Sequence, residues 1–204
     1  EEINFAARRS EYVDFKSGVS ARMSITAFEN LISTAKRRML INGEKESFVR
    51  LSDFTGIIPA INGKIELVYE GEEQGADQIS FNLINDGVKT IFLKFFPEIS
   101  KLQKPNEVTP YDGILSWFIE NNNELFIGDE FTDKEYKNTL DEVKPVDILI
   151  KKYCKNINNK DIYFMKEVLL WGLSTFKKLT KNRMQDGIEF KDSLGTYLNN
   201  LNSE

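Results

Sequence analysis

The residues with the clearest chemical signature lie in the stretch Ser17–Ser24, SGVSARMS. Ser20 stands directly before an amphipathic run, where a serine side chain often caps the N-terminus of a helix. Arg22 then falls in the first helical turn, where a cation opposes the positive end of the helix dipole at a cost of roughly 0.3–1 kcal/mol. The backbone already favours an anion at this position, so the arginine needs a reason of its own to be there.

Residues for several other kinds of chemistry are missing from the sequence. The chain contains no histidine, which excludes Ser-His triads, Cys-His pairs and imidazole metal ligands. It contains neither a Walker-type phosphate loop nor a dinucleotide-binding glycine motif. The acidic pairs Glu72-Glu73 and Asp141-Glu142 fall in segments that we expect to be exposed, and Cys154 lies in an apolar run that predicts burial. We therefore expect no catalytic residues and no metal site in this chain.

The composition is typical of a globular protein that works inside the cell. The chain has 204 residues, 41% of them hydrophobic, and a net charge of −5, which argues against a general nucleic-acid surface. No apolar run approaches the roughly 20 residues that span a bilayer, and the lone cysteine indicates a reducing compartment, so we expect a cytoplasmic location and no membrane partner. The basic runs at 36–38 and 177–183 are expected to be solvated faces of helices.

Helical signals dominate the elements that must position Arg22. The run from Ser24 to Ile41 is expected to be a helix whose inner face carries Ile25, Phe28, Ile32, Ala35 and Met39. The sequence also predicts a helix over 2–13, a short helix over 51–61 that Pro59 should end or kink, and a long helix over 75–96 that Pro97 stops.

The second half of the chain carries the same kind of signals. Helices are predicted from residue 110, from the capping box Thr132–Glu135, over 146–153, over 162–179 and over 190–201. Strand signals are few, because the run 125–127 is too short to anchor a sheet and 65–69 could be strand or helix. We expect an all-α fold in two blocks, 1–100 and 108–204, joined by a polar linker over 101–108.

An extended pattern around Arg22 resembles the lid domain of AAA+ ATPases, in the branch of MoxR-type ATPases and the magnesium chelatase ATPase subunit. The approach loop at 12–22, YVDFKSGVSAR, carries the pattern Gly18-x-Ser20-x-Arg22 before a long helix. The segments 35–54 and 61–72, the latter INGKIELVYEGE, are similar to parts of magnesium-chelatase-like proteins. MoxR-type lids usually have proline before the arginine, where this chain has Ala21. The resemblance covers about the first hundred residues, and the region after Pro110 matches no domain that we can name.

This resemblance offers a reason for the arginine. In such lids it is a second sensor of the nucleotide, and a guanidinium binds phosphate oxygens through a paired fork. The resemblance thus implies a nucleotide-binding set of Arg22, Ser20 and Gly18, with bound phosphate offsetting the local cost of the cation. A competing interpretation leaves Arg22 exposed and paired with Asp14 or Glu11.

Two classes of function follow, and a third is weaker. In the first, the chain is the non-catalytic lid and helical extension of a longer AAA+ ATPase. The chain begins Glu1-Glu2-Ile3 without Met, so we expect the phosphate-loop core to lie upstream. That core would hold ATP and Mg²⁺, neighbouring subunits would complete a ring, and the work would be done on an unidentified protein or metal-insertion partner.

The second class is a helical protein–protein interaction module with no nucleotide role, whose surface could be the Trp117/Phe118 or Trp171/Phe176 face. A small-molecule enzyme is the weakest reading, because no nucleophile–base pair can be assembled without histidine.

Overall fold

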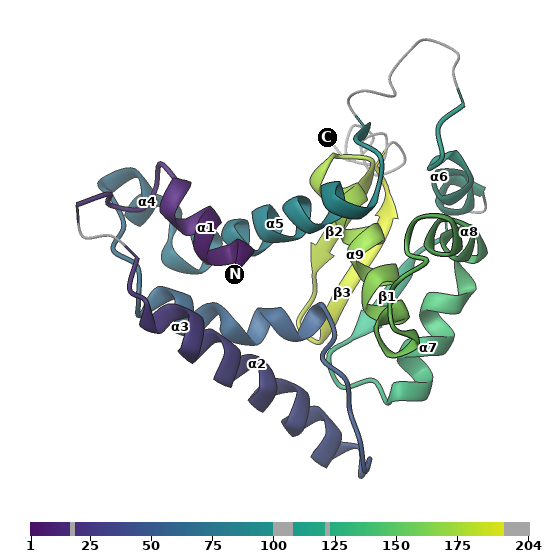
Figure 1. Cartoon of the computed structure of the whole chain (residues 1–204), viewed down its shortest axis with the longest axis horizontal. Coiled ribbons are helices and arrows are strands. Elements are labelled where there is room, and N and C mark those ends of the chain that lie inside the picture. Colours follow the sequence, from purple (N-terminus) through teal and green to yellow (C-terminus); the bar gives the residue numbers. More distant parts are fainter. Residues whose placement is uncertain (17–18, 100–107, 121–122, 194–204) are drawn as a thin grey trace, which may run out of the picture. The chain divides into compact units, whose positions relative to one another are not determined.

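The computed structural model (Figure 1) describes residues 1–16, 19–99, 108–120 and 123–193. The chain divides into two compact units, Glu1–Ile91 and Phe92–Glu204. The described part is largely helical, but the expected all-α class is wrong for the second unit, which contains a three-stranded sheet. No helix among the described residues combines the length and apolar character that crossing a membrane requires.

The first unit consists of helices joined by short extended segments. Its elements are α1 (Glu2–Arg9), α2 (Arg22–Ile41), the 3-10 helix η1 (Ser52–Ile57), α3 (Ile58–Asn62), α4 (Tyr69–Gln74) and most of α5 (Ala76–Phe95). The predicted helix over 51–61 is a 3-10 helix followed by an α-helix, and Pro59 lies in the first turn of α3, where its missing N–H costs nothing. The ambiguous segment 65–69 is extended up to Val68, and α4 begins at Tyr69.

Helix α2 is rotated relative to the orientation that its apolar spacing predicts. Met23, Ala35 and Arg38 are its buried residues, whereas Ile25 is 63% exposed and Phe28 is 64% exposed. The expected inner face is therefore wrong for Ile25 and Phe28, although Ala35 is buried as predicted.

A buried ion pair accounts for this rotation. Arg38 is 2% exposed, and its guanidinium donates to Asp53 Oδ2 at 2.9 Å, to Ser47 Oγ at 2.9 Å and to the Phe48 carbonyl oxygen at 2.8 Å. Asp53 also accepts the backbone N–H of Arg50 at 2.8 Å. The expectation of a solvated basic face at 36–38 is thus wrong for Arg38, because a charge that is fully satisfied by hydrogen bonds can lie in a core.

The second unit places helices against a small antiparallel sheet. Its elements are α6 (Asp112–Ile119), β1 (Leu125–Gly128), α7 (Asp133–Glu142), α8 (Lys144–Tyr153), the 3-10 helix η4 (Asn159–Asp161), α9 (Ile162–Thr175), β2 (Leu179–Arg183) and β3 (Gly187–Asp192). The strand order is β1-β3-β2, with Ile127 opposite Ile188 and Lys181 opposite Phe190.

Three sequence expectations are corrected in this unit. The run 125–127, judged too short to anchor a sheet, is the core of the edge strand β1. The helix expected to reach residue 179 ends at Thr175, where Lys177 takes a positive φ of 57° and turns the chain into β2. Of the helix expected over 190–201, residues 190–192 belong to β3, and 194–204 lie outside the described residues.

The core of the second unit gathers around α9. Trp171 is fully buried, and Phe92 packs against Tyr111 and Phe176 with ring centroids 5.9 and 5.5 Å apart. Phe92 belongs to this aromatic cluster, and the two compact units divide inside α5. Of the linker predicted over 101–108, residues 101–107 lie outside the described residues.

Candidate functional site at the start of α2

The loop that leads into α2 is held on the segment 64–68. Val13 pairs with Leu67 and Val19 pairs with Ile65 in isolated antiparallel bridges. The backbone N–H of Ser20 donates to the Lys64 carbonyl oxygen at 3.3 Å. The described parts of the loop are therefore fixed at both ends, which gives the start of α2 a defined position within its unit.

Ser20 lies one residue earlier than a true N-cap. Helix α2 begins at Arg22, and its N-cap position is occupied by Ala21, which makes no side-chain cap. Ser20 still accepts two hydrogen bonds from the first turn, with its Oγ from the Arg22 N–H at 3.3 Å and with its carbonyl oxygen from the Met23 N–H at 2.9 Å. Those two backbone donors are already used, so an anion at this helix start would depend mainly on the arginine side chain.

The Arg22 side chain is exposed. Within the described residues it makes no ion pair and no side-chain hydrogen bond, and the competing pairing with Glu11 or Asp14 is absent there. The first turn of α2 contains no acidic residue that could offset the positive end of the helix dipole. Arg22 is thus a cation held at a helix start with its guanidinium open to an external anion.

The structure brings Ser20 and Arg22 together at one helix start, where the Arg22 backbone N–H donates to Ser20 Oγ. Gly18, the third predicted member of the site, lies outside the described residues.

An apolar stripe continues from Arg22 along α2, and sequence reasoning assigned it to the wrong side. Ile25 follows Arg22 by three positions and Phe28 follows Ile25 by three, so Ile25 is a neighbour of both Arg22 and Phe28 on the surface of the helix. Both apolar side chains are more than half exposed, and Ile32 on the same face is partly exposed. The helical periodicity was visible in the sequence, but the burial of Arg38 on another face was not.

Comparisons of this chain with protein-family models, with curated proteins and with solved structures give no match. The described residues contain no group of three or more cysteine and acidic side chains placed to hold a metal ion.

Proposed function

We propose that this chain is the lid and helical extension of an AAA+ ATPase of the MoxR and magnesium-chelatase-like branch. In this proposal Arg22 is the second-sensor arginine, and the phosphate-loop core belongs to a longer protein that includes these residues. The observation that carries the proposal is the exposed guanidinium of Arg22, without a described partner, at the first turn of a helix whose approach loop is fixed. A terminal phosphate would supply the anion that this position favours.

The apolar stripe on α2 supports the same proposal. Ile25 is a neighbour of both Arg22 and Phe28 on the helix surface, so a domain that covers Ile25 would also approach the guanidinium. Burying an exposed leucine-sized or phenylalanine-sized side chain stabilises a contact by about 1.5–3 kcal/mol. A core domain docked on this stripe would therefore both shield the apolar surface and bring a bound nucleotide towards Arg22.

The chemistry assigned to this chain is electrostatic. The guanidinium would bind terminal phosphate oxygens through two parallel N–H bonds and stabilise the charge that develops as the phosphoryl group is transferred. ATP and Mg²⁺ would be held by the core, so the isolated chain is expected to hydrolyse no ATP. In this proposal neighbouring subunits form a ring with the core and this chain, and the ring acts on an unidentified protein partner.

The test compares two arginines of the same helix in the longer protein. Arg22→Ala is expected to lower single-turnover ATP hydrolysis by about 10³-fold, in the range of arginines that contact a transferring phosphoryl group. Arg37→Ala removes an exposed arginine from the same helix and serves as the matched control, with an expected change below about threefold. Equal rates for the two variants would refute the sensor role.

The alternative function is a helical interaction module without a nucleotide role. The exposed Ile25 and Phe28 favour it, since such a stripe also suits a protein partner. The surfaces that the sequence offered for this role are less suitable, because Phe118 and Trp171 are fully buried. If Ile25→Ser weakens partner capture while nucleotide binding and hydrolysis are absent from the longer protein, the module is the correct description.

A further inference from the structure

The apolar residues of α2 follow the spacing of a coiled-coil seam. Steps of three, four, three and four residues separate Ile25, Phe28, Ile32, Ala35 and Met39, which is the a and d pattern of the heptad repeat. The sequence predicts these residues as the buried face of the helix, but Ile25 is 63% exposed and Phe28 is 64% exposed. A seam with heptad spacing that its own unit leaves open is typical of a helix that packs against a second helix.

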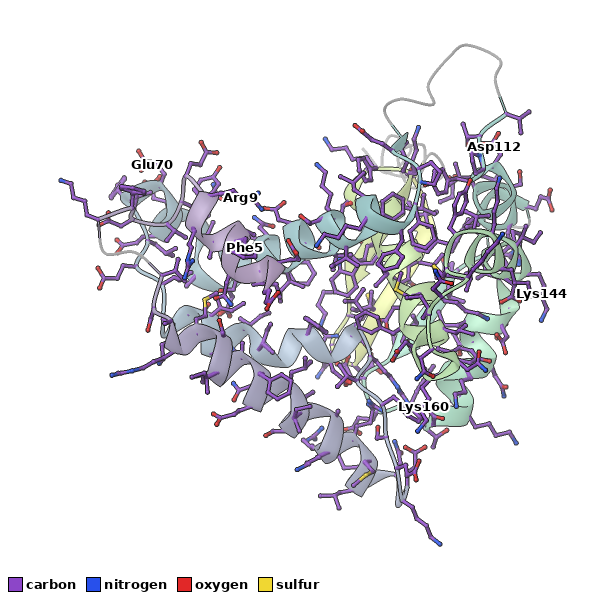
Figure 2. The ribbon with its side chains drawn as sticks, viewed as in Figure 1. Phe5, Arg9, Glu70, Asp112, Lys144 and Lys160 are labelled. Carbon is purple, nitrogen blue, oxygen red and sulfur yellow. The ribbon has the colours of Figure 1, made fainter. Side chains whose placement is uncertain are left out.

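This seam lies on the outer side of the first unit. In the view of Figures 1 and 2, α2 runs along the border of its unit, and side chains project from its outer side. Ile32 and Met39 are partly exposed, whereas Ala35 is buried beside Arg38, which anchors the inner face of the helix. The open part of the seam therefore consists of Ile25, Phe28, Ile32 and Met39.

Two charges of opposite sign flank the seam. Glu29 and Lys36 occupy the e position of successive heptads, where coiled coils place the charges that choose partner and orientation. Both side chains are exposed, and neither makes an ion pair with another described residue. They stand seven residues apart, which is roughly 10 Å along the helix axis, so they do not pair with each other. An external partner can therefore use both charges.

An antiparallel second copy of α2 is complementary to these charges. Reversing one helix places its e positions beside the e positions of the other. With a two-fold axis near Ser33, Glu29 lies opposite the partner's Lys36, and by symmetry Lys36 lies opposite the partner's Glu29. A parallel pair instead places the e positions beside the g positions, where Ser24 and Leu31 carry no charge. The charge pattern thus favours the antiparallel orientation.

The same charges select one alignment among the antiparallel ones. Sliding one helix by a heptad places Glu29 opposite the partner's Glu29, or Lys36 opposite the partner's Lys36, and like charges disfavour both alignments. A slide of two heptads can pair Arg22 with Glu29, but it removes Met39 from the seam. Only the alignment around Ser33 combines opposite charges with the full apolar stripe.

We infer that the apolar face of α2 binds a second copy of this chain as an antiparallel helix pair. In this alignment Phe28 packs against the partner's Met39, and Ile32 packs against the partner's Ala35. The inference does not depend on the nucleotide role of Arg22. It uses the face that the proposed function gives to the nucleotide-binding core, so the core and a second copy would occupy this face in turn.

Sedimentation equilibrium of the 204-residue chain tests the dimer directly. Association from monomer to dimer is expected, with a dissociation constant of about 50 μM, because the seam is short. Glu29→Lys and Lys36→Glu each place like charges at both ion pairs of the dimer, so each should weaken association about tenfold. Glu73→Lys makes the same charge change at an exposed position of α4 and should leave association within about twofold.

A mixing experiment tests the antiparallel alignment. The Glu29→Lys chain has two cations at these positions and the Lys36→Glu chain has two anions. An equimolar mixture should therefore form a heterodimer whose dissociation constant lies within about threefold of that of the unchanged homodimer. The chain that carries both substitutions exchanges the two charges and should recover the homodimer to the same extent. Both positions are exposed, so the variants should fold normally, which circular dichroism checks.

Three results would overturn the inference. The first is a monomer at about 1 mM chain, which lies well above the expected dissociation constant. The second is a dimer that Phe28→Ser and the charge reversals leave unchanged, which would assign the contact to another surface. The third is a mixture of the two charge variants that associates no better than each variant alone. None of these results bears on the sensor role, which the comparison of Arg22→Ala with Arg37→Ala tests separately.

Discussion

The ion pair between Arg38 and Asp53 offers the sharpest test of how α2 acquires its orientation. Removing the carboxylate by Asp53→Ala leaves a guanidinium that is 2% exposed, with only Ser47 Oγ and the Phe48 carbonyl oxygen as its remaining acceptors in this network. Breaking a buried pair in this way typically costs about 3–5 kcal/mol. The Arg50 N–H, which donates to Asp53 at 2.8 Å, loses its acceptor as well.

A double variant distinguishes the cost of leaving Arg38 without its partner from the cost of losing the ion pair as a whole. Arg38→Met with Asp53→Ala removes both charges, and replacing a buried pair by apolar groups is often close to neutral. We therefore expect the double variant to be more stable than Asp53→Ala alone by about 2 kcal/mol or more. Arg37→Met, at the exposed neighbouring position, is the matched control and should change stability by less than about 0.5 kcal/mol.

Native-state hydrogen exchange of the α2 amides is the appropriate assay, because a chain of two compact units need not unfold in one step. The free energy of opening should fall by about 3–5 kcal/mol in Asp53→Ala. If the first unit is less stable than this loss, Asp53→Ala should leave the α2 amides without protection. A loss below about 1 kcal/mol would mean that the pair is solvated, and the explanation for the outward position of Ile25 and Phe28 would then fail.

Two further predictions concern the second unit. Lys181 Nζ lies 3.6 Å from the Trp171 ring centroid, and burial lowers the pKa of its ammonium to about 6 despite the nearby carboxylate of Glu167. Between pH 6 and its ordinary pKa of about 10.4 the unfolded chain binds more protons, so stability should rise with pH across this window. Lys181→Met should remove most of that rise, and an unchanged slope of tryptophan-monitored melting temperature against pH would refute the assignment. Thr132→Ala removes the cap that accepts the Glu135 N–H at 3.2 Å, so urea unfolding of this unit should show a loss of about 1 kcal/mol, whereas no loss would mean that the capping box is dispensable.

The features that the sequence predicted well are local ones. The capping box of Thr132 and Glu135 is confirmed, because its partners are three residues apart. Helix α5 ends at Phe95, just before Pro97, as the restriction on residues before proline requires. Such signals depend on near neighbours in the chain and can be read without knowledge of the fold.

The features that the sequence missed depend on distant partners. Arg38 looks like its neighbours Lys36 and Arg37 in the sequence, and what distinguishes it is its burial against partners that include Asp53, 15 residues away. Strand β2 follows directly from an apolar helix, and its pairing with β3 decides its conformation. The candidate site contains one feature of each kind. The sequence alone indicates that Arg22 is an unusual residue. The exposure of Ile25 and Phe28, in contrast, depends on the distant ion pair between Arg38 and Asp53.

The most direct measurement of the central proposal is a structure of the longer protein with Mg²⁺ and a non-hydrolysable ATP analogue. The account predicts that the Arg22 guanidinium lies about 2.7–2.9 Å from a terminal phosphate oxygen, the usual length of a charge-assisted hydrogen bond. It also predicts that Ile25 and Phe28 are covered by the nucleotide-binding core. A bound nucleotide with Arg22 in solvent, or paired with a carboxylate of its own unit, would contradict the account.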